Sequence, residues 1–318
     1  MKIGWIGVGR MGRFMAGHLM DAGHGVTLHD IRRDLAEPLL KRGALWATSP
    51  ADAARGSKLV FLSLPTPEAA REVVLGEKGV IEGAARGAVV IETSTSSHDV
   101  VLELGQALRA RGIRFMDSPV SGGERGAETR DLCVMASGVR ATYDAVKPVL
   151  DLIGDKVMYC GPLGHGTVCK LCHQLFGSGM AQVAYEVLTT GVKAGVKLET
   201  LLEAISKSAI GKRPPLSGWR EGGLSDSFEM RPYSVPLSIM VKDVTLARQL
   251  GRKFQVPMDV GDVVELRYVE AARRGLCNQG GLGGDIEVRA HEGHIARKSR
   301  DEVGERLDRV EMSLGDAG

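Results

Sequence analysis

Three glycines near the start of the chain have the spacing of a nucleotide-binding turn. Gly7, Gly9 and Gly12 follow an apolar run at residues 2–6 and precede a helical pattern that begins at Phe14. In such a unit the first glycine permits a tight turn, the second lets the backbone approach a pyrophosphate, and the third lets the helix pack against its strand. The spacing predicts a dinucleotide site, with a plain glycine-rich turn as the alternative. The predicted binding segment consists of Gly7, Val8, Gly9, Arg10, Met11 and Gly12.

An acidic residue at the end of the second predicted strand indicates which dinucleotide binds. The strand covers residues 26–29 and ends at Asp30, where an acid ordinarily accepts a hydrogen bond from a ribose 2′-hydroxyl. Arg32 and Arg33 come next, and they either face solvent or contact a 2′-phosphate. Because a carboxylate would repel that phosphate, the sequence favours NAD, with NADP as the alternative.

Candidate binding residues lie at or just after the ends of three more predicted strands. These strands lie at residues 58–64, 88–92 and 113–116. Leu64 and Pro65 come at the end of the first, Thr95 follows the second, and Ser121 follows the third. Ligands bind at the carboxyl ends of parallel strands, so we expect these residues to line one crevice. The alternative is that they are ordinary turn residues.

The segment Ser121, Gly122 and Gly123 has a composition that suits an anion. Two glycines after a serine allow consecutive backbone N–H groups to point into one concavity, and the hydroxyl adds a further donor. A plain loop explains the same spacing equally well. We therefore expect either the carboxylate of a substrate or no ligand at this segment.

The elements that must position these residues belong to an α/β fold followed by helices. Strands alternate with helical segments up to about residue 162, which predicts a doubly wound, mainly parallel sheet. One long helix is predicted at residues 163–194, and the rest is mostly helical, with helices at about 198–208, 237–254 and 260–274. The expected domains are therefore 1–162 and an all-α 163–318, with the active site in the cleft between them. With 318 residues, 43% hydrophobic residues and a net charge of +2, composition favours a globular protein that binds neither nucleic acid nor membrane.

Four segments resemble motifs of the 3-hydroxyisobutyrate dehydrogenase family, the β-hydroxyacid dehydrogenases, which are related to 6-phosphogluconate dehydrogenase. The likeness extends over about residues 1–285. The matching segments are the turn from Gly7 to Gly12, the run from Asp117 to Gly123, the run from Gly164 to Lys170, and the pair Lys242 and Asp243. The resemblance implies reversible hydride transfer between NAD and a small 3-hydroxy acid, in a homodimer or homotetramer.

The resemblance also assigns roles to individual residues. Lys170 matches the general acid/base of the family, although its position alone would indicate a solvated lysine. Lys242 resembles a lysine near the nicotinamide, and Gln174 replaces the second asparagine of the usual Lys-Leu-x-Asn-Asn, where it is expected to contact substrate. Arg130, His173 and Arg213 are further altered positions that bear on substrate choice. Val168, Leu171 and Leu175 belong to an apolar stripe that we expect to hold the long helix in place.

The remaining features point to no metal and no disulfide framework. Cys169 and Cys172 form a C-x-x-C pair without a second pair at zinc spacing, so we interpret them as packing residues. We expect His291 and His294 to be solvated and Asp285 to have no role. The tail at residues 291–318 is predicted to form an added amphipathic helix. The cysteine usage and the absence of a signal-peptide pattern favour the cytoplasm.

Two other functions remain open. One is an NADPH-dependent aldehyde or semialdehyde reductase of the same family, which differs in its preferred cofactor. The other is a dinucleotide-binding sensor without turnover, against which Lys170, Ser121 and Lys242 together argue. An imine reductase fits less well because relatives of that kind usually lack the lysine.

Overall fold

The computed structural model describes residues 1–212, 241, 244–245, 248–249 and 251–273. The chain divides into two compact units, Met1–Phe176 and Gly177–Gly318. The division falls inside helix α9 (His165–Lys193), whereas the predicted domain boundary at residue 162 precedes this helix.

The first unit is built on one sheet with the strand order β3-β2-β1-β4-β5-β6-β8-β7, and β9 pairs with β8. Its strands are β1 (Lys2–Ile6), β2 (Gly25–His29), β3 (Leu45–Trp46), β4 (Leu59–Leu62), β5 (Val89–Glu92), β6 (Arg114–Asp117), β7 (Val120–Ser121), β8 (Cys133–Ser137) and β9 (Lys156–Gly161). All pairings from β3 to β6 are parallel, and β8 is antiparallel to β6 and β7. The order reverses at β1, between β2 and β4, and such reversals are where doubly wound sheets bind ligands. The predicted fold class is confirmed.

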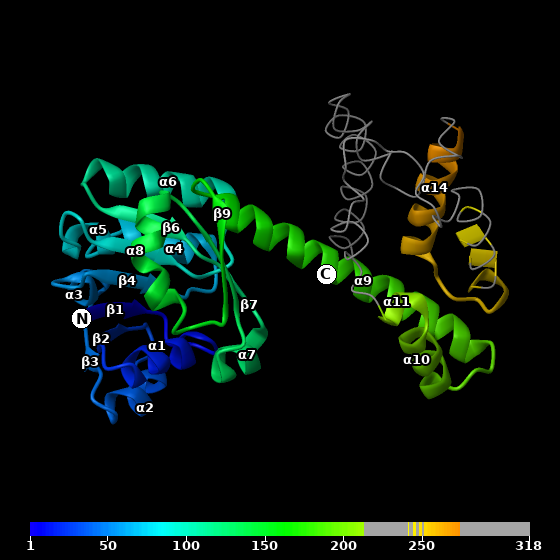
Figure 1. Cartoon of the computed structure of the whole chain (residues 1–318), viewed down its shortest axis with the longest axis horizontal. Coiled ribbons are helices and arrows are strands. Elements are labelled where there is room, and N and C mark those ends of the chain that lie inside the picture. The colour runs from blue at the N-terminus through cyan, green and yellow to red at the C-terminus, as the bar shows by residue number, and fades with distance from the viewer. Residues whose placement is uncertain (213–240, 242–243, 246–247, 250, 274–318) are drawn as a thin grey trace, which may run out of the picture. The chain divides into compact units, whose positions relative to one another are not determined.

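Helices cover both faces of this sheet (Figure 1). Helices α1 (Gly12–Asp21) and α8 (Arg140–Leu150) contribute to one core layer. The other layer contains α3 (Pro50–Ala54), α4 (Pro67–Leu75), α5 (Val80–Gly83) and α6 (His98–Ala110). Side chains alternate along a strand. The rings of Trp5 and Phe61 therefore stack in the first layer, with their centroids 5.0 Å apart, while Val60 and Leu62 pack in the second. The shorter helices are η1 (Arg33–Ala36), α2 (Glu37–Leu40) and α7 (Gly123–Thr129).

Side-chain caps determine where three of these helices begin. The hydroxyls of Ser49, Thr66 and Ser97 accept hydrogen bonds from backbone N–H groups in the first turns of α3, α4 and α6. Proline follows the cap at Pro50 and Pro67, where its missing N–H costs nothing and its fixed φ suits the helix. These starts follow strand ends closely, so the strand-end residues are held in short, well-defined connections.

The described part of the second unit is helical. Besides the end of α9 it contains α10 (Leu198–Lys207), α11 (Ala209–Lys212) and α14 (Asp259–Arg273). The Glu186 carboxylate of α9 accepts hydrogen bonds from Val260 N at 2.8 Å and Gly261 N at 2.9 Å, and an anion at a helix N-terminus is stabilising. The predicted helices at 198–208 and 260–274 correspond to α10 and α14, and half of the residues of the one at 237–254 lie outside the described part of the chain. Of the helices described, none has the length and apolar character needed to cross a membrane.

Candidate active site

The glycine turn after β1 has the shape that its spacing predicts. Gly7 has φ of 95°, and a Cβ there would lie 2.1 Å from Ser63 O, so a side chain is excluded both by conformation and by space. Trp5 Nε1 donates a buried hydrogen bond to Gly7 O at 2.9 Å, which holds the turn in place. A Cβ at Gly9 would meet nothing within 4 Å. The backbone at Gly9 therefore faces open space into which a ligand can approach.

Asp30 holds this turn as well as facing the pocket. Its Oδ2 accepts a hydrogen bond from Val8 N at 2.8 Å, and its Oδ1 accepts one from Arg32 N at 2.9 Å. The Arg32 guanidinium forms an ion pair with Asp34, in which Arg32 Nη2 lies 2.5 Å from Asp34 Oδ2. The Arg33 guanidinium lies over the Trp46 ring, 5.7 Å from its centroid. Both arginines thus have partners of their own in the chain.

A cavity of about 780 Å³ extends from the glycine turn along the strand ends. Its lining includes Gly7, Gly9, Arg10, Met11, Asp30, Leu64, Pro65, Thr95, Ser121, Gly122, Gly123, Lys170 and Gln174. The strand-end residues expected to share one crevice therefore do so. Val8 and Gly12 are buried behind the turn and are absent from the lining. All lining residues belong to the first unit.

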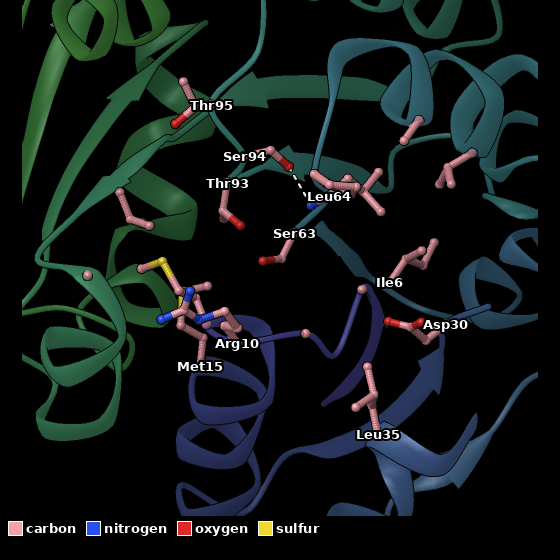
Figure 2. Close-up of a pocket in the computed structure, with 18 of the residues that line it drawn as sticks. Ile6, Arg10, Met15, Asp30, Leu35, Ser63, Leu64, Thr93, Ser94 and Thr95 are labelled. Carbon is pink, nitrogen blue, oxygen red and sulfur yellow. Dashed lines mark hydrogen bonds between the residues drawn. The ribbon is translucent and has the colours of Figure 1, made fainter. Parts of the chain in front are cut away.

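The walls at the ends of β4 and β5 are tied together by hydroxyl groups. Leu64 N donates to Ser94 Oγ at 2.7 Å, the contact drawn as a dashed line in Figure 2. Thr93 Oγ1 donates to Leu62 O at 2.6 Å. Ser94 was not singled out from the sequence, although it directly precedes Thr95 and belongs to the same polar strand end. These hydrogen bonds hold the ends of β4 and β5 together, and they leave the open side of the cavity accessible to a ligand.

The serine–glycine segment, Ser121 to Gly123, forms another wall of the same cavity. Gly122 has φ of 147° and Gly123 has φ of 66°, both values that favour glycine. A Cβ on Gly122 would lie 2.6 Å from Asp131 O. The Ser121 hydroxyl is 3.3 Å from His173 Nε2, so one of the residues that departs from the family pattern touches the predicted substrate segment.

Lys170 is buried where α9 borders this cavity. Its side chain is 6% exposed, and Nζ donates to Gln174 Oε1 at 3.0 Å. Burial lowers the pKa of the Lys170 ammonium below its usual value, and the negative charge of the nearby Cys133 sulfur, when it is ionised, opposes this in part. A lysine with a lowered pKa beside an open pocket is suited to proton transfer. The interpretation of Lys170 as a solvated lysine, which its position alone suggests, does not hold.

The prediction that an apolar stripe anchors α9 is wrong for its first half. Leu171 is 41% exposed and Leu175 is 76% exposed, while Thr167, one turn before Leu171, is 1% exposed. The helix is held instead by hydrogen bonds from its first turn to Asp117 and Ser137. The hydrophobic periodicity therefore marks a surface of the helix and not its packed face.

Two ion pairs link the glycine turn and the start of α1 to α7, which follows the serine–glycine segment. The Glu124 carboxylate on α7 accepts hydrogen bonds from Arg10 Nε at 2.9 Å and from Arg13 Nη2 at 2.7 Å. Glu124 was not predicted, because nothing local in the sequence relates it to residues more than a hundred positions away. The bridge holds Arg10 at the pocket rim, where Figure 2 shows its guanidinium.

Several predicted features fall outside the described residues. These are Lys242, Asp243, Arg213, Asp285, His291, His294 and the tail at 291–318. Cys169 and Cys172 are free and exposed, so they are not packing residues here. Among the residues that the structure describes, no cluster of histidine, cysteine and acidic side chains is arranged to hold a metal ion.

Comparison with known proteins places this site in a family. Residues 2–161 match the model of the NAD-binding domain of 6-phosphogluconate dehydrogenase. Residues 164–281 match the model described as the NAD-binding region of NADP-dependent 3-hydroxyisobutyrate dehydrogenase. The chain belongs to the 3-hydroxyisobutyrate dehydrogenase family. The family consists of NAD(P)-dependent oxidoreductases, as the four sequence motifs predict.

Individual relatives show how varied the family is. The chain is 32% identical to 2-(hydroxymethyl)glutarate dehydrogenase of Eubacterium barkeri, over 81% of this chain and 85% of the relative. It is 30% identical to glyoxylate/succinic semialdehyde reductase 1 of Arabidopsis thaliana, over 87% and 94%. The solved structure of a Streptomyces aurantiacus imine reductase has a TM-score of 0.76 and 21% identity, over 90% and 99%, which is a likeness in fold alone.

Proposed function

We propose that this protein is an NAD-dependent dehydrogenase that oxidises a small 3-hydroxy carboxylic acid reversibly, with Lys170 as general acid/base. The observation that carries this proposal is the burial of Lys170 at a dinucleotide pocket. Burial lowers the pKa of the Lys170 ammonium, which is the change that a lysine base requires near neutral pH.

The residues of the pocket fit a nicotinamide dinucleotide. The open space at Gly9 and the tight turn at Gly7 would admit the pyrophosphate. Asp30 lines the pocket with carboxylate lone pairs to spare for a ribose hydroxyl. Leu64, Pro65 and Thr95 would border the nucleoside halves. When bound, NAD supplies the hydride acceptor, or in its reduced form the hydride donor.

The chain's own groups would bind the acid and handle its hydroxyl proton. The backbone N–H groups of Ser121 to Gly123, with the Ser121 hydroxyl, would hold the substrate carboxylate. The neutral Lys170 Nζ would accept the substrate hydroxyl proton during oxidation and return it during reduction. Gln174, within 3.0 Å of that nitrogen, would keep Nζ directed at the hydroxyl. We further propose that Lys242 contacts the nicotinamide and that the protein is a cytoplasmic homodimer or homotetramer.

The preference for NAD is supported by the environment of Asp30. Arg32 and Arg33, the residues that would recognise a 2′-phosphate, are engaged with Asp34 and Trp46. The carboxylate of Asp30 would also repel that phosphate. A second function, NADPH-dependent reduction of a semialdehyde, is favoured by the likeness to the Arabidopsis reductase, and it would require Arg32 to leave Asp34.

A substrate panel tests these proposals. Hydroxy acids with the hydroxyl on the α-, β- or γ-carbon, and the matching semialdehydes, are assayed with NAD and with NADP by the absorbance of reduced nicotinamide. The expected result is the highest kcat/KM for a 3-hydroxy acid with NAD. Preference for a semialdehyde with NADPH would favour the reductase, and NAD binding without turnover on any member would favour a sensor.

A further inference from the structure

A buried aspartate holds the start of the helix that carries Lys170. Asp117 ends β6 and is 0% exposed. Its Oδ1 accepts hydrogen bonds from Gly164 N at 2.9 Å and from the Ser137 hydroxyl. Its Oδ2 accepts from Thr167 N at 2.7 Å and from Thr167 Oγ1 at 2.9 Å. Two strands and the first turn of α9 thus meet at one carboxyl group.

Ser137 and Gly166 complete this arrangement. Ser137 Oγ accepts a hydrogen bond from Gly166 N at 2.9 Å. A Cβ on Gly166 would lie 2.2 Å from Met135 O, so the helix backbone rests directly on β8. The first N–H groups of a helix have no partner inside the helix. Here Asp117 and Ser137 supply partners for those of Gly164, Gly166 and Thr167, and we call Asp117, Ser137 and Thr167 the Asp117 cluster.

The cluster selects which face of α9 points inward. Thr167, Lys170 and Gln174 are spaced by three and four residues, so they lie on one face of the helix. Thr167 is 1% exposed and Lys170 is 6% exposed, whereas the adjacent Leu171 is 41% exposed. Apolar packing alone would turn leucine inward and lysine outward. Polar contacts at the first turn therefore determine the rotation of the helix in this segment.

We propose that Asp117 is a positioning residue, which fixes the rotation of α9 and so presents Lys170 to the pocket. The inference rests on the proposed function for the chemistry of Lys170, but its geometry stands on the contacts above. Two groups near Lys170 in the described structure are the Cys133 thiol on β8 and the Gln174 amide on α9. The hydrogen bonds that tie the start of the helix to the sheet come from the Asp117 cluster one turn earlier.

Replacing Asp117 with asparagine tests this inference. Asp117→Asn keeps the shape but sets an NH₂ group against N–H donors, so one side of the cluster loses its acceptor. We expect α9 to turn or fray at its start, and Lys170 to become hydrated. Its pKa, measured by NMR in the cofactor-free protein labelled with ¹³C at the lysine ε-carbon, should rise toward that of a free lysine. The fraction of neutral amine, and kcat with it, should fall about tenfold for each unit of that rise.

Matched variants separate positioning from general destabilisation. Thr167→Val removes only the hydroxyl bond and should raise the pKa of Lys170 less than Asp117→Asn does. Thr142→Val, at a buried threonine in the first turn of α8, and Asp52→Asn, at a carboxylate near the start of α3, should leave it unchanged. The Kd for NAD should stay constant throughout.

The inference is overturned if Asp117→Asn folds and Lys170 titrates as in the unaltered protein. If that variant does not fold, Thr167→Val decides, and an unchanged titration of Lys170 overturns the inference. Normal kcat in Lys170→Ala would refute only the acid/base role. In that case the NMR titration of Asp117→Asn still decides whether the cluster positions the lysine.

Discussion

The charge state of Lys170 decides whether this residue can act as the base of the proposed reaction. An ordinary lysine is protonated at neutral pH and is a poor base, and here burial lowers its pKa. Lys170→Ala should lower kcat by about 10² to 10⁴-fold, with little change in the Kd for NAD, because the turn from Gly7 to Gly12 does not involve this residue. Steady-state kinetics and calorimetric titration measure the two quantities.

The pH dependence of the reaction gives a further check on the same residue. The neutral amine increases as pH rises through its pKa, so oxidation by the unaltered enzyme should increase with pH along one ionisation below that of a free lysine. Lys170→Ala should lack this rise. Lys207→Ala, at an exposed lysine paired with Glu203 on α10, should retain it. A near-normal kcat for Lys170→Ala on the best substrate would contradict the proposed mechanism.

Asp30 has two tasks at once, and its replacement should separate them. Asp30→Ala removes the ribose contact proposed for NAD together with the bond to Val8 N. Hydrogen bonds to charged groups are worth about 1.5 to 3 kcal/mol, so kcat/KM for NAD should fall about tenfold to a hundredfold. The value for NADP should fall less, because its 2′-oxygen carries a phosphate. Asp144→Ala, at an exposed ion pair on α8, is the control, and a higher kcat/KM with NADP in the unaltered enzyme would contradict the assignment.

At the scale of elements, neighbouring strand ends place two carboxyl groups in contrasting environments. Glu92 on β5 is in register with Asp117 on β6. Asp117 accepts four hydrogen bonds, whereas Glu92 accepts one from Ser94 N, and its Oε2 has no partner in the part of the chain that the structure describes. Burial raises the pKa of Glu92 to about 7. The end of β5 therefore carries a carboxyl group that folding keeps protonated below about pH 7.

Because of this raised pKa of Glu92, the free energy of unfolding should decrease as the pH rises. An unfolded chain loses the Glu92 proton near pH 4.5 and the folded protein near pH 7, so between these values folding binds a proton and the free energy of unfolding decreases. The loss reaches about 3 kcal/mol above pH 7. Glu92→Gln should match the unaltered protein at pH 4 and exceed its stability at pH 8, as measured by urea unfolding. Exposed Glu128→Gln is the control, and a stability difference independent of pH would contradict the prediction.

The elements nearest the N-terminus were predictable because their signals are local. The spacing of Gly7, Gly9 and Gly12 is contained within one turn, and the buried strands β4 and β5 are continuous apolar runs. Strand β7 spans only two residues, too few to show alternation. The buried face of α9 was predicted wrongly because its position depends on Asp117, about fifty residues earlier in the chain. Local periodicity carries no record of such a contact.

At the scale of the whole molecule, the described part of the chain exposes apolar side chains on its long helix. Val168, Leu171, Leu175, Met180 and Val192 of α9 are each more than 40% exposed. Large exposed apolar surfaces are unusual for a protein that acts alone and often mark interfaces. This observation supports the proposed homo-oligomer, in which we expect the exposed stripe of α9 to contact another copy of the chain.

The assembly can be tested by placing charge on this stripe. Leu175→Glu adds a carboxylate where the side chain is 76% exposed, so it should cost a monomer little. In an interface it would bury an unpaired charge, which is strongly unfavourable. Light scattering at micromolar concentration should therefore give an oligomeric mass for the unaltered protein and a lower mass for this variant.

Two further variants sharpen the test of assembly. Leu45→Glu places the same charge at a 65% exposed leucine on β3, outside α9, and should leave the mass unchanged. Deleting residues 289–318 asks whether the tail contributes, since a tail that packs between subunits should lower the mass when it is removed. A monomeric mass for the full chain would refute the oligomer, because the exposed leucines of α9 would then face solvent in the working protein.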